Sequence, residues 1–514
     1  MKKNLFIIQV LLCLSIAISA ATFSGKVTDV NGKAIAGAKV LVVENNQTTT
    51  TDTKGEWSLK SDERSLTLVF HKDGYTYEQF VDQASGRNID MTLREAKKSA
   101  ATLREEGYVK HGCETVSIPN DAEWNVEFKI SNLKGDLAPD QNIIRRDPSA
   151  VINVDGTYYM WYSYSPRVME GKDAPWDLND LYYATSKDGI TWDEKGLAVK
   201  RGEAGSYDHR SVFTCEILEA KGKYYLVYQC AADENGIYLR NTVGMSYSDS
   251  PDGPWTKLDK PVLHPTYTNE VFFDNTCVHD PCIVPYNGKF HLYYKGECNC
   301  MDNDGCVKWC NPVCGLKKQV KWGVAISDNP TGPYVKSEFN PITNTGHEVM
   351  VWPYGDGMAI LQHQDGPEAM SIQYAEDGFN FDIKGKVAGF PEAAGLARTT
   401  KSNTNPHAGI KWGVGHKLMW NIPGGWMYIY RFDKVGVETN IPDAAEPQSS
   451  VEIFPNPTDN TLNIKGDFDR WEISSLIGQA LRSGSEAKVD VSSLEKAMYI
   501  ISFDNGQAQM FSKI

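Results

Sequence analysis

One strand pattern recurs through the middle of this chain of 514 residues and constrains its fold more than any other feature. In each copy a glycine-containing turn precedes an aromatic-rich strand, and a second strand ends in a D-G or D-x-P turn. Five copies lie between about residues 136 and 435: DGTYYMWYSYS with LYYATSKDGITW, GKYYLVYQC with VGMSYSDSPDGPW, NGKFHLYYKG with KWGVAISDNPTGPY, GMAILQHQ with SIQYAEDGFNF, and HKLMWNI with WMYIYRFD. Several short strands per repeated unit are typical of a β-propeller, so the pattern predicts five blades. Inner strands of such blades face one axis, where side chains distant in sequence converge.

The first 20 residues, MKKNLFIIQVLLCLSIAISA, read as a secretory signal peptide. Two lysines precede an apolar stretch from Leu5 to Ile18, and small residues follow it, so we expect cleavage after Ala20 or Ala21. The apolar stretch is too short to span a membrane, and no later segment approaches a span. We therefore predict an exported protein without a membrane-spanning segment.

Smaller strand-rich segments flank the repeats, so the predicted fold class is all-β. Residues 22–95 alternate apolar positions around an N-G turn and predict a β-sandwich. Residues 96–119 read as a short charged helix or linker ahead of the propeller, which is assigned residues 120–435. A second linker at 436–447 leads to a last β-sandwich at 448–514.

The net charge excludes some classes of partner. Acidic residues outnumber basic ones by 66 − 52 = 14. An acidic surface argues against nucleic acid and anionic membranes as partners. Aromatic residues make up 11% of the chain, which suits strand cores and also sugar-stacking surfaces.

Ten cysteines remain once the signal peptide is removed, and half of them form one run. That run comprises Cys298, Cys300, Cys306, Cys310 and Cys314. Export favours disulfides, and the spacing C-x-C-x5-C-x3-C-x3-C matches no standard zinc finger. We predict disulfides that staple a long loop here, with zinc binding as the alternative.

Two aspartates stand directly before prolines at matching blade positions, Asp147 in the first blade and Asp280 in the third. A proline favours extended backbone in the residue before it. We expect these carboxylates near the axis, where at least one could activate water, and the alternative is an ordinary turn aspartate paired with a neighbouring arginine. The start of the second blade, YDHRSVFTCEIL, repeats the theme less closely and offers Asp208, His209, Arg210 and Glu216.

The fourth blade begins differently, with His347 and Glu348 side by side in NTGHEVMVW. Adjacent side chains of a strand face opposite sides, so both reach one pocket only if the backbone bends there. Either could donate a proton: histidine titrates near neutrality, and a glutamate does so when burial raises its pKa. A structural His–Glu pair is the alternative. Glycoside hydrolysis needs two opposed groups of these kinds, and the axis would supply them.

These motifs resemble known families. Residues 22–95 resemble the carboxypeptidase regulatory-like domain, a spacer or presentation module. The FPNP, SLIGQ and FSKI stretches of the last segment resemble the sorting domain of the type IX secretion system, which is an address without chemistry. The stretches RRDPSAVI, YDHRSVFTCEIL and HDPCIVPYNGKFHLYYKG, with the run from Lys321 to Trp352, resemble glycoside hydrolase family 117. The family 43 propellers are its more distant relatives.

The resemblance to family 117 implies a five-bladed propeller and an exo-enzyme. Members release 3,6-anhydro-L-galactose from the non-reducing ends of agar oligosaccharides by inversion. On that resemblance Asp147 is the general base, Asp280 holds the substrate or tunes the acid, and His347 is the acid with Glu348 beside it. How His347 and Glu348 divide the work stays open. The candidate sugar contacts are Arg145, Arg146, His209, Arg210, Trp352, His279 and His363.

The resemblance also sets expectations for cofactors and partners. No cofactor is required and no protein side chain is assigned as a metal ligand, although a divalent cation at the propeller axis, held largely through water, is allowed. The partners are an oligosaccharide and the type IX secretion machinery, and the protein is secreted or on the cell surface. A dimer stays open, because a sandwich and a short helix here occupy the region where family members exchange a helical segment.

Three alternatives to the leading interpretation remain. The sugar could come from carrageenan or another galactan, since the cysteine run lies near the active face and could reshape the pocket. The enzyme could be a family 43-like arabinosidase or xylosidase. The propeller could instead bind sugar without turning it over.

Overall fold

A computed structural model describes residues 20–63, 65–84, 88–110, 116–233, 240–298, 320–363, 366–392, 395–398, 411–435, 451–466, 468–475, 480–503 and 508–514. The predicted signal peptide up to residue 19, the linker at 436–447 and the cysteine run after Cys298 lie outside these ranges. The chain divides into two compact units, Met1–Thr439 and Asn440–Ile514. In the described part, no helix is long and apolar enough to cross a membrane.

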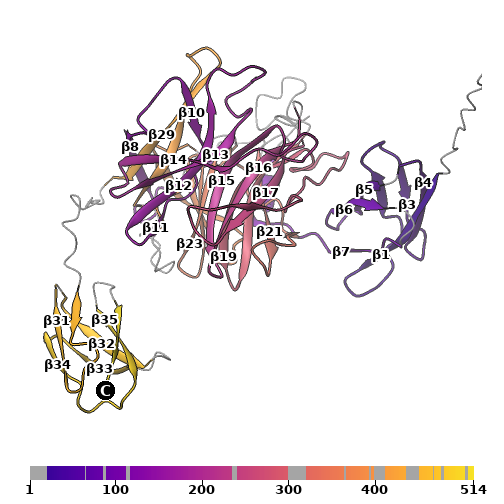
Figure 1. The fold of residues 1–514 in the computed structure, drawn as a ribbon. Coiled ribbons are helices and arrows are strands. Elements are labelled where there is room, and N and C mark those ends of the chain that lie inside the picture. The colour runs from indigo at the N-terminus through magenta and orange to yellow at the C-terminus, as the bar shows by residue number, and fades with distance from the viewer. Residues whose placement is uncertain are drawn as a thin grey trace, which may run out of the picture. The chain divides into compact units, whose positions relative to one another are not determined.

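The N-terminal segment forms two sheets around one core (Figure 1). Its strands are β1 (Ala21–Asp29), β4 (Glu56–Ser61) and β7 (Met91–Leu93) in one sheet, and β2 (Lys39–Val42), β3 (Thr48–Thr50), β5 (Ser65–His71) and β6 (Glu78–Ala84) in the other. Phe23 and Trp57 of the first sheet share the core with Phe70 of the second. Exposed and buried positions alternate along β4, as one-sided packing of a strand requires.

A single helix, α1 (Ala100–Lys110), connects this segment to the strands that follow. It begins at Ser99, whose hydroxyl accepts a hydrogen bond of 3.2 Å from the Thr102 amide, as an N-cap side chain does. Of the two possibilities that the sequence left open for residues 96–119, helix or linker, residues 100–110 are helical.

Three four-stranded antiparallel units follow in sequence order, the first of them with two additional short strands. The first sheet contains β9 (Lys134–Gly135), β10 (Ile143–Arg146), β11 (Ile152–Val154), β12 (Thr157–Pro166), β13 (Asp180–Ser186) and β14 (Thr191–Val199). The second contains β15 (Ser211–Ala220), β16 (Lys223–Ala231), β17 (Thr242–Ser248) and β18 (Thr256–Lys257). The third contains β19 (Cys277–Tyr286), β20 (Lys289–Glu297), β21 (Lys321–Ser327) and β22 (Val335–Lys336).

The fourth and fifth units are joined by a strand from the start of the domain, β8 (Val126–Asn132), which pairs with both of them. The fourth contains β23 (Val349–Tyr354), β24 (Gly357–Gln362), β25 (Ser371–Ala375) and β26 (Asp382–Ala388). The fifth contains β27 (Gly395–Leu396), β28 (Trp412–Met419) and β29 (Trp426–Lys434), completed by β8 as its outer strand. We interpret these five units as the blades of a propeller closed by its own N-terminal strand.

The five sequence copies fall on the second and third strands of each blade, from the β12–β13 pair to the β28–β29 pair. Each copy is preceded by a strand that begins its blade: β10, β15, β19, β23 or β27. These leading strands carry or adjoin most of the candidate residues.

The C-terminal unit also consists of two sheets around a core that includes Trp471 and Phe511. Its strands are β30 (Glu452–Phe454), β31 (Thr461–Lys465), β32 (Trp471–Ser475), β33 (Ala480–Gly484), β34 (Lys488–Asp490), β35 (Met498–Phe503) and β36 (Ala508–Ser512).

The expectation that cysteines of an exported protein form disulfides does not hold for four cysteines of the propeller. Cys215, Cys230, Cys277 and Cys282 are buried free thiols, although export favours disulfides. Each lies on a propeller strand, and Cys215, Cys230 and Cys282 belong to apolar clusters, where a thiol packs as a small hydrophobic group. Cys298 is buried and disulfide-bonded. The other cysteines of its run lie outside the described residues, so the pairing within the run stays a prediction.

Candidate active site

A cavity of about 260 Å³ is lined by side chains from all five blades. Each blade contributes at least one polar residue to its lining, among them Asp147, Thr214, Asp280, Glu348 and His416 in blade order. The cavity is therefore the place where the blades converge, as the repeats predict.

Asp147 lies at the end of β10 and is almost completely buried. Its Oδ2 accepts a hydrogen bond of 2.7 Å from the Thr214 hydroxyl and lies 2.8 Å from Nη2 of Arg146. Its Oδ1 lies 2.9 Å from Nδ1 of His416. Burial alone would raise the pKa of Asp147, but the charges of Arg146 and His416 outweigh it and hold the pKa well below the usual value. The carboxylate is therefore ionised over the whole physiological pH range.

Three blades present their cavity residue from the same strained backbone. Asp147, Thr214 and Asp280 have φ values of 46°, 48° and 47°, in the left-handed region that non-glycine residues rarely occupy. At Thr214 and Asp280 the pairing with the next strand shifts register, so these residues form bulges. Bulges turn a side chain away from its regular direction, and strain of this kind clusters at functional sites. The extended backbone predicted before Pro148 and Pro281 is therefore wrong, since both aspartates are left-handed, and at Asp280 a bulge overrides the local preference.

Asp280 belongs to a chain of alternating charges on β19 and β20. Its Oδ2 lies 2.5 Å from Nζ of Lys295, and His279 Nε2 lies 3.2 Å from Oε1 of Glu297. Burial alone would raise the pKa of Glu297, but His279 and Lys295 outweigh it and lower the pKa to about 2. Burial alone would lower the pKa of Lys295, but Asp280 and Glu297 raise it. All four groups line the cavity.

His347 and Glu348 both line the cavity, although they are neighbours in sequence. The chain bends at these two residues, before β23 begins at Val349. Gly346 precedes them with a φ of 127°, and a Cβ there would lie 2.5 Å from Oε1 of Gln362, so only glycine fits. The backbone bend that the sequence argument required is therefore present.

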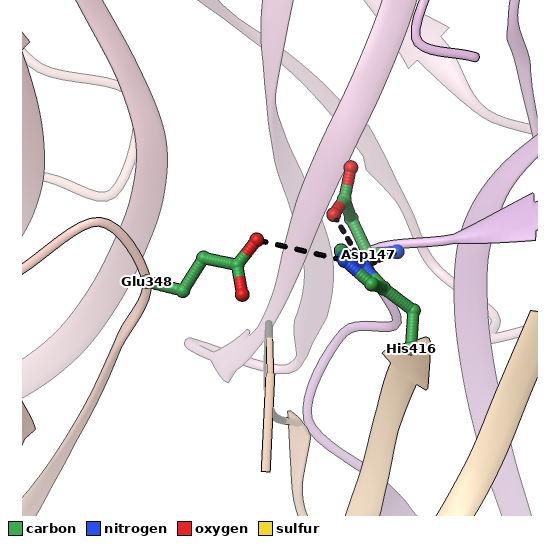
Figure 2. A group of neighbouring side chains, drawn as sticks. All are labelled: Asp147, Glu348 and His416. Atoms are coloured by element: carbon green, nitrogen blue, oxygen red, sulfur yellow. Dashed lines mark hydrogen bonds and ion pairs between the residues drawn. The ribbon is translucent and has the colours of Figure 1, made fainter. Parts of the chain in front are cut away.

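His416 on β28 contacts both Asp147 and Glu348 (Figure 2). Its Nδ1 faces Asp147, and its Nε2 lies 3.5 Å from Oε1 of Glu348. Burial alone would lower the pKa of His416, but the carboxylates of Glu348 and Asp147 outweigh it and raise the pKa. In the protonated state, His416 places a positive charge between two carboxylates that would otherwise repel each other.

The remaining predicted residues lie outside the cavity lining. Arg145 pairs with Glu194, because adjacent strand residues face opposite sides and Arg146 takes the cavity side. Arg210 pairs with Asp177 through two hydrogen bonds, and His209 is exposed. Trp352 is part of an apolar core, and His363 is buried against the ring of Phe390.

Six of the eleven predicted residues thus meet in the cavity: Asp147, Asp280, His347, Glu348, Arg146 and His279. Thr214 and His416 are missed by the sequence argument. Aligning F-T-C at 213–215 with R-D-P and H-D-P could have found Thr214, whereas His416 lies inside the weakest repeat without a distinctive neighbour. Glu216, named at the second blade, does line the cavity, where burial raises its pKa and Arg398 approaches within 3.3 Å.

One group of side chains in the described part of the chain could hold a metal ion. Oxygens of Asp147 and Glu348 and a ring nitrogen of His416 lie within 4.8 Å of one another. Carboxylate and imidazole donors together suit a divalent cation, so these three residues could hold one directly, whereas the resemblance allowed a cation held largely through water.

Comparison with known sequences identifies the outer segments. Residues 23–105 match the CarboxypepD_reg-like domain family, and residues 452–514 match the secretion system C-terminal sorting domain. The sorting domain indicates a secreted or cell-surface protein. Residues 141–298 match Glycosyl hydrolases family 43.

Individual proteins are also similar to parts of this chain. An uncharacterised protein of Mycobacterium tuberculosis, MT1551, is 26% identical over 166 residues, which are 30% of this chain. The match spans about half of that curated relative, 48% of its length. A GH43_1 enzyme from Xanthomonas citri is 13% identical, with a TM-score of 0.37, over 57% of this chain and 89% of its own.

This chain is similar to the structure of Zg3597, a family 117 glycoside hydrolase of the marine bacterium Zobellia galactanivorans. It is 36% identical, with a TM-score of 0.52, and the match covers 61% of this chain and 92% of Zg3597. Sequence identity at this level over nearly the whole of a relative, together with a cavity lined by paired carboxylates at the meeting point of the blades, identifies the enzyme class. The chain belongs to glycoside hydrolase family 117.

Proposed function

We propose that this protein is an exo-acting glycoside hydrolase that removes 3,6-anhydro-galactose from the non-reducing ends of red-algal galactan oligosaccharides, neoagaro-oligosaccharides in particular, by an inverting acid/base mechanism. The observation that carries the proposal is the ionised, buried Asp147, held by Arg146, Thr214 and His416 in the same cavity as His347 and Glu348. An inverting glycosidase needs such a base opposite a proton donor.

In this proposal Asp147 removes a proton from the attacking water. Its low pKa keeps it ionised, and the Thr214 hydroxyl and the Arg146 guanidinium hold its orientation. Asp280 and Lys295 form a fixed ion pair on the cavity wall, which suits the binding of sugar hydroxyls or the tuning of the acid.

The proton donor is proposed to be His347 rather than Glu348. Two carboxyl groups that invert a glycosidic bond stand about 6.5–9.5 Å apart, to leave room for water. Between Asp147 and Glu348, however, the His416 imidazole contacts one oxygen of each carboxylate, at 2.9 and 3.5 Å. Glu348 instead faces His416, so its role is to hold that imidazole.

Enclosure by five blades supports action at a chain end. Cavity walls from every blade leave a site suited to one terminal sugar and not to the middle of a polymer.

The proposed chemistry uses protein side chains alone and requires no cofactor. A divalent cation held by Asp147, Glu348 and His416 would add fixed positive charge for the binding of sugar oxygens.

Product analysis tests the proposal. The purified protein is incubated with neoagaro- and neocarra-oligosaccharides, and the released monosaccharide and its anomer are identified by chromatography and NMR. We expect anhydro-galactose from the neoagaro series, with inverted configuration. If no monosaccharide is released from either series, the proposal is rejected.

The family 43 match over residues 141–298 favours a second candidate, an arabinosidase or xylosidase. Aryl arabinosides and xylosides in the same experiment separate the two activities. Turnover of these substrates with none of the galactan series would establish the second candidate.

Two tryptophans extend the site at its rim. Trp176 lines the cavity, and Trp420, after β28, packs edge-on against it with ring centroids 6.3 Å apart. Trp420 keeps 62% of its surface exposed, although it is large and apolar.

We expect Trp420→Ala to raise KM for tetra- and hexasaccharides roughly three- to tenfold with little change in kcat, since lost stacking weakens ground and transition states alike. Steady-state kinetics check this, with exposed Val168→Ala as the control; equal KM values would exclude Trp420 from substrate binding.

A further inference from the structure

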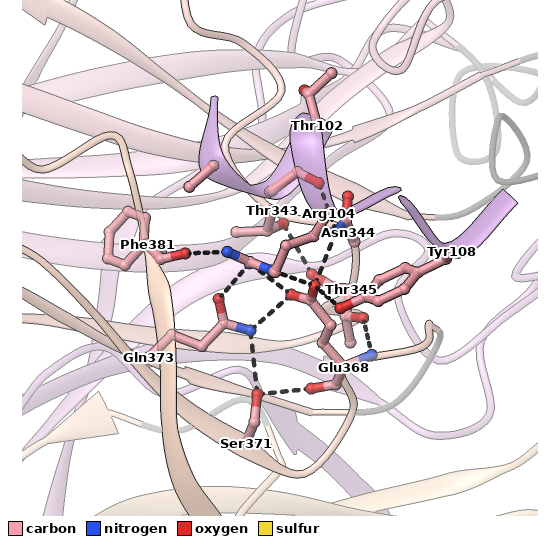
Figure 3. Close-up of polar contacts among 12 residues, drawn as sticks. Thr102, Arg104, Tyr108, Thr343, Asn344, Thr345, Glu368, Ser371, Gln373 and Phe381 are labelled. Carbon is pink, nitrogen blue, oxygen red and sulfur yellow. Dashed lines mark hydrogen bonds and ion pairs between the residues drawn. The ribbon is translucent and has the colours of Figure 1, made fainter. Parts of the chain in front are cut away.

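A buried carboxylate outside the cavity joins helix α1 to the fourth blade (Figure 3). Glu368 is completely buried, and its two oxygens accept hydrogen bonds of 2.8 and 3.0 Å from Nε and Nη2 of Arg104. Tyr108, Asn344 and Gln373 each donate a further hydrogen bond of 2.9 Å to the same carboxylate. Burial alone would raise the pKa of Glu368, but Arg104 outweighs it and lowers the pKa. The ion pair is bidentate and fully bonded, which makes it rigid.

The same hydrogen-bond network around Glu368 holds the segment from Thr343 to Gly346. The Asn344 amide group donates to Glu368 and also, at 2.8 Å, to the backbone carbonyl of Ala101 on α1. The backbone amide of Glu368 donates to the Thr345 hydroxyl at 2.9 Å. Asn344 and Thr345 are buried, so no water replaces these bonds if they are lost.

This segment leads directly into the cavity. The Gly346 carbonyl accepts a hydrogen bond of 2.6 Å from the Trp322 indole, and His347 and Glu348 follow at once. Gly346 is closely packed, since a Cβ there would lie 2.6 Å from a methyl group of Val349. A displacement of residues 343–346 therefore moves His347.

We infer that Arg104 of helix α1 is a positioning residue for the active site: through Glu368 it holds residues 343–346 and so places His347 toward the substrate. This rests on the proposed function, in which His347 donates the proton. The helix would then be part of the catalytic apparatus without touching the cavity. Misplacement of a reacting group by about 1 Å can cost on the order of 10²-fold in rate.

Two variants test the inference on the full-length secreted protein. Arg104→Gln removes the bidentate ion pair with Glu368. Tyr108→Phe removes one hydroxyl that donates to Glu368, so it is the milder variant and keeps the test open if Arg104→Gln destabilises the fold. We expect kcat on neoagaro-oligosaccharides to fall roughly ten- to hundredfold for Arg104→Gln and about two- to fivefold for Tyr108→Phe, with KM nearly unchanged. Lys98→Ala is the control, because it breaks only an exposed ion pair with Glu106 near the same helix.

A substrate that needs little acid catalysis separates positioning from general damage. With an aryl glycoside of the same sugar, whose phenolate leaves without a proton, Arg104→Gln should recover most of wild-type kcat. In a His347→Ala background, Arg104→Gln should cause no further loss. Equal losses on both substrates, or additive losses in the double variant, would overturn the inference.

Amide hydrogen exchange gives a readout that needs no activity. Exchange in residues 343–348 should rise in Arg104→Gln and stay at the wild-type level in Lys98→Ala. Unchanged exchange in Arg104→Gln overturns the positioning role. If exchange rises in Arg104→Gln but the wild-type protein releases no sugar, the structural link stands and the proposed function is rejected.

Discussion

Asp147→Asn is expected to lower kcat by about 10³- to 10⁴-fold while the Kd for an oligosaccharide changes only a few-fold, because a general base of this kind contributes up to about 10⁴-fold and acts on water rather than on sugar. Asparagine keeps the size of the side chain and an oxygen that can accept the Thr214 hydrogen bond. It removes the negative charge that takes the proton from water. Single-turnover kinetics and calorimetric titration measure the two quantities.

A matched control is available in the fifth blade. Asp433 is also buried and paired with an arginine, Arg431, at 2.7 Å, but it lies outside the cavity lining. Asp433→Asn should therefore change stability and leave the kcat of the folded protein near the wild-type value. Near-normal kcat in Asp147→Asn would remove Asp147 from the role of base.

His347→Ala is expected to be about as damaging as Asp147→Asn on oligosaccharides, with a loss of about 10²- to 10⁴-fold in kcat. Glu348→Gln should be milder, because Glu348 contacts His416 and acts through that imidazole. The loss in His347→Ala should shrink on an aryl glycoside, whose leaving group needs no proton. Steady-state kinetics with both substrates measure this.

His209→Ala serves as the control for this comparison, because His209 is exposed and lies outside the cavity lining. It should turn over both substrates at the wild-type rate. A mild loss in His347→Ala combined with a severe one in Glu348→Gln would transfer the role of acid to Glu348.

Much of the architecture follows from local patterns in the sequence. The paired aromatic strands and D-G turns recur five times, and each copy became the second and third strands of one blade. Hydrophobic alternation and turn residues act over fewer than ten residues, so they can be read without knowing the fold. The two Asp-Pro steps likewise marked matching positions, and Asp147 and Asp280 do share one backbone conformation.

Which side chains meet in the cavity was decided by the tertiary structure. Arg145 and Arg146 are neighbours of the same type, and only the pairing of β10 with β12 turns Arg146 inward and Arg145 toward Glu194. Thr214 carries no distinctive chemistry until a bulge directs its hydroxyl at Asp147, 67 residues earlier in the chain.

His416 depends on the fold even more strongly. It lies 269 residues from Asp147 in sequence, and ring closure by β8 builds the blade that brings the two together. The sequence by itself determined the repeats, the turns and the two aspartates, because these rest on local backbone preferences. The tertiary structure decided the charge balance around Asp147 and the placement of His347, because both depend on contacts between segments hundreds of residues apart.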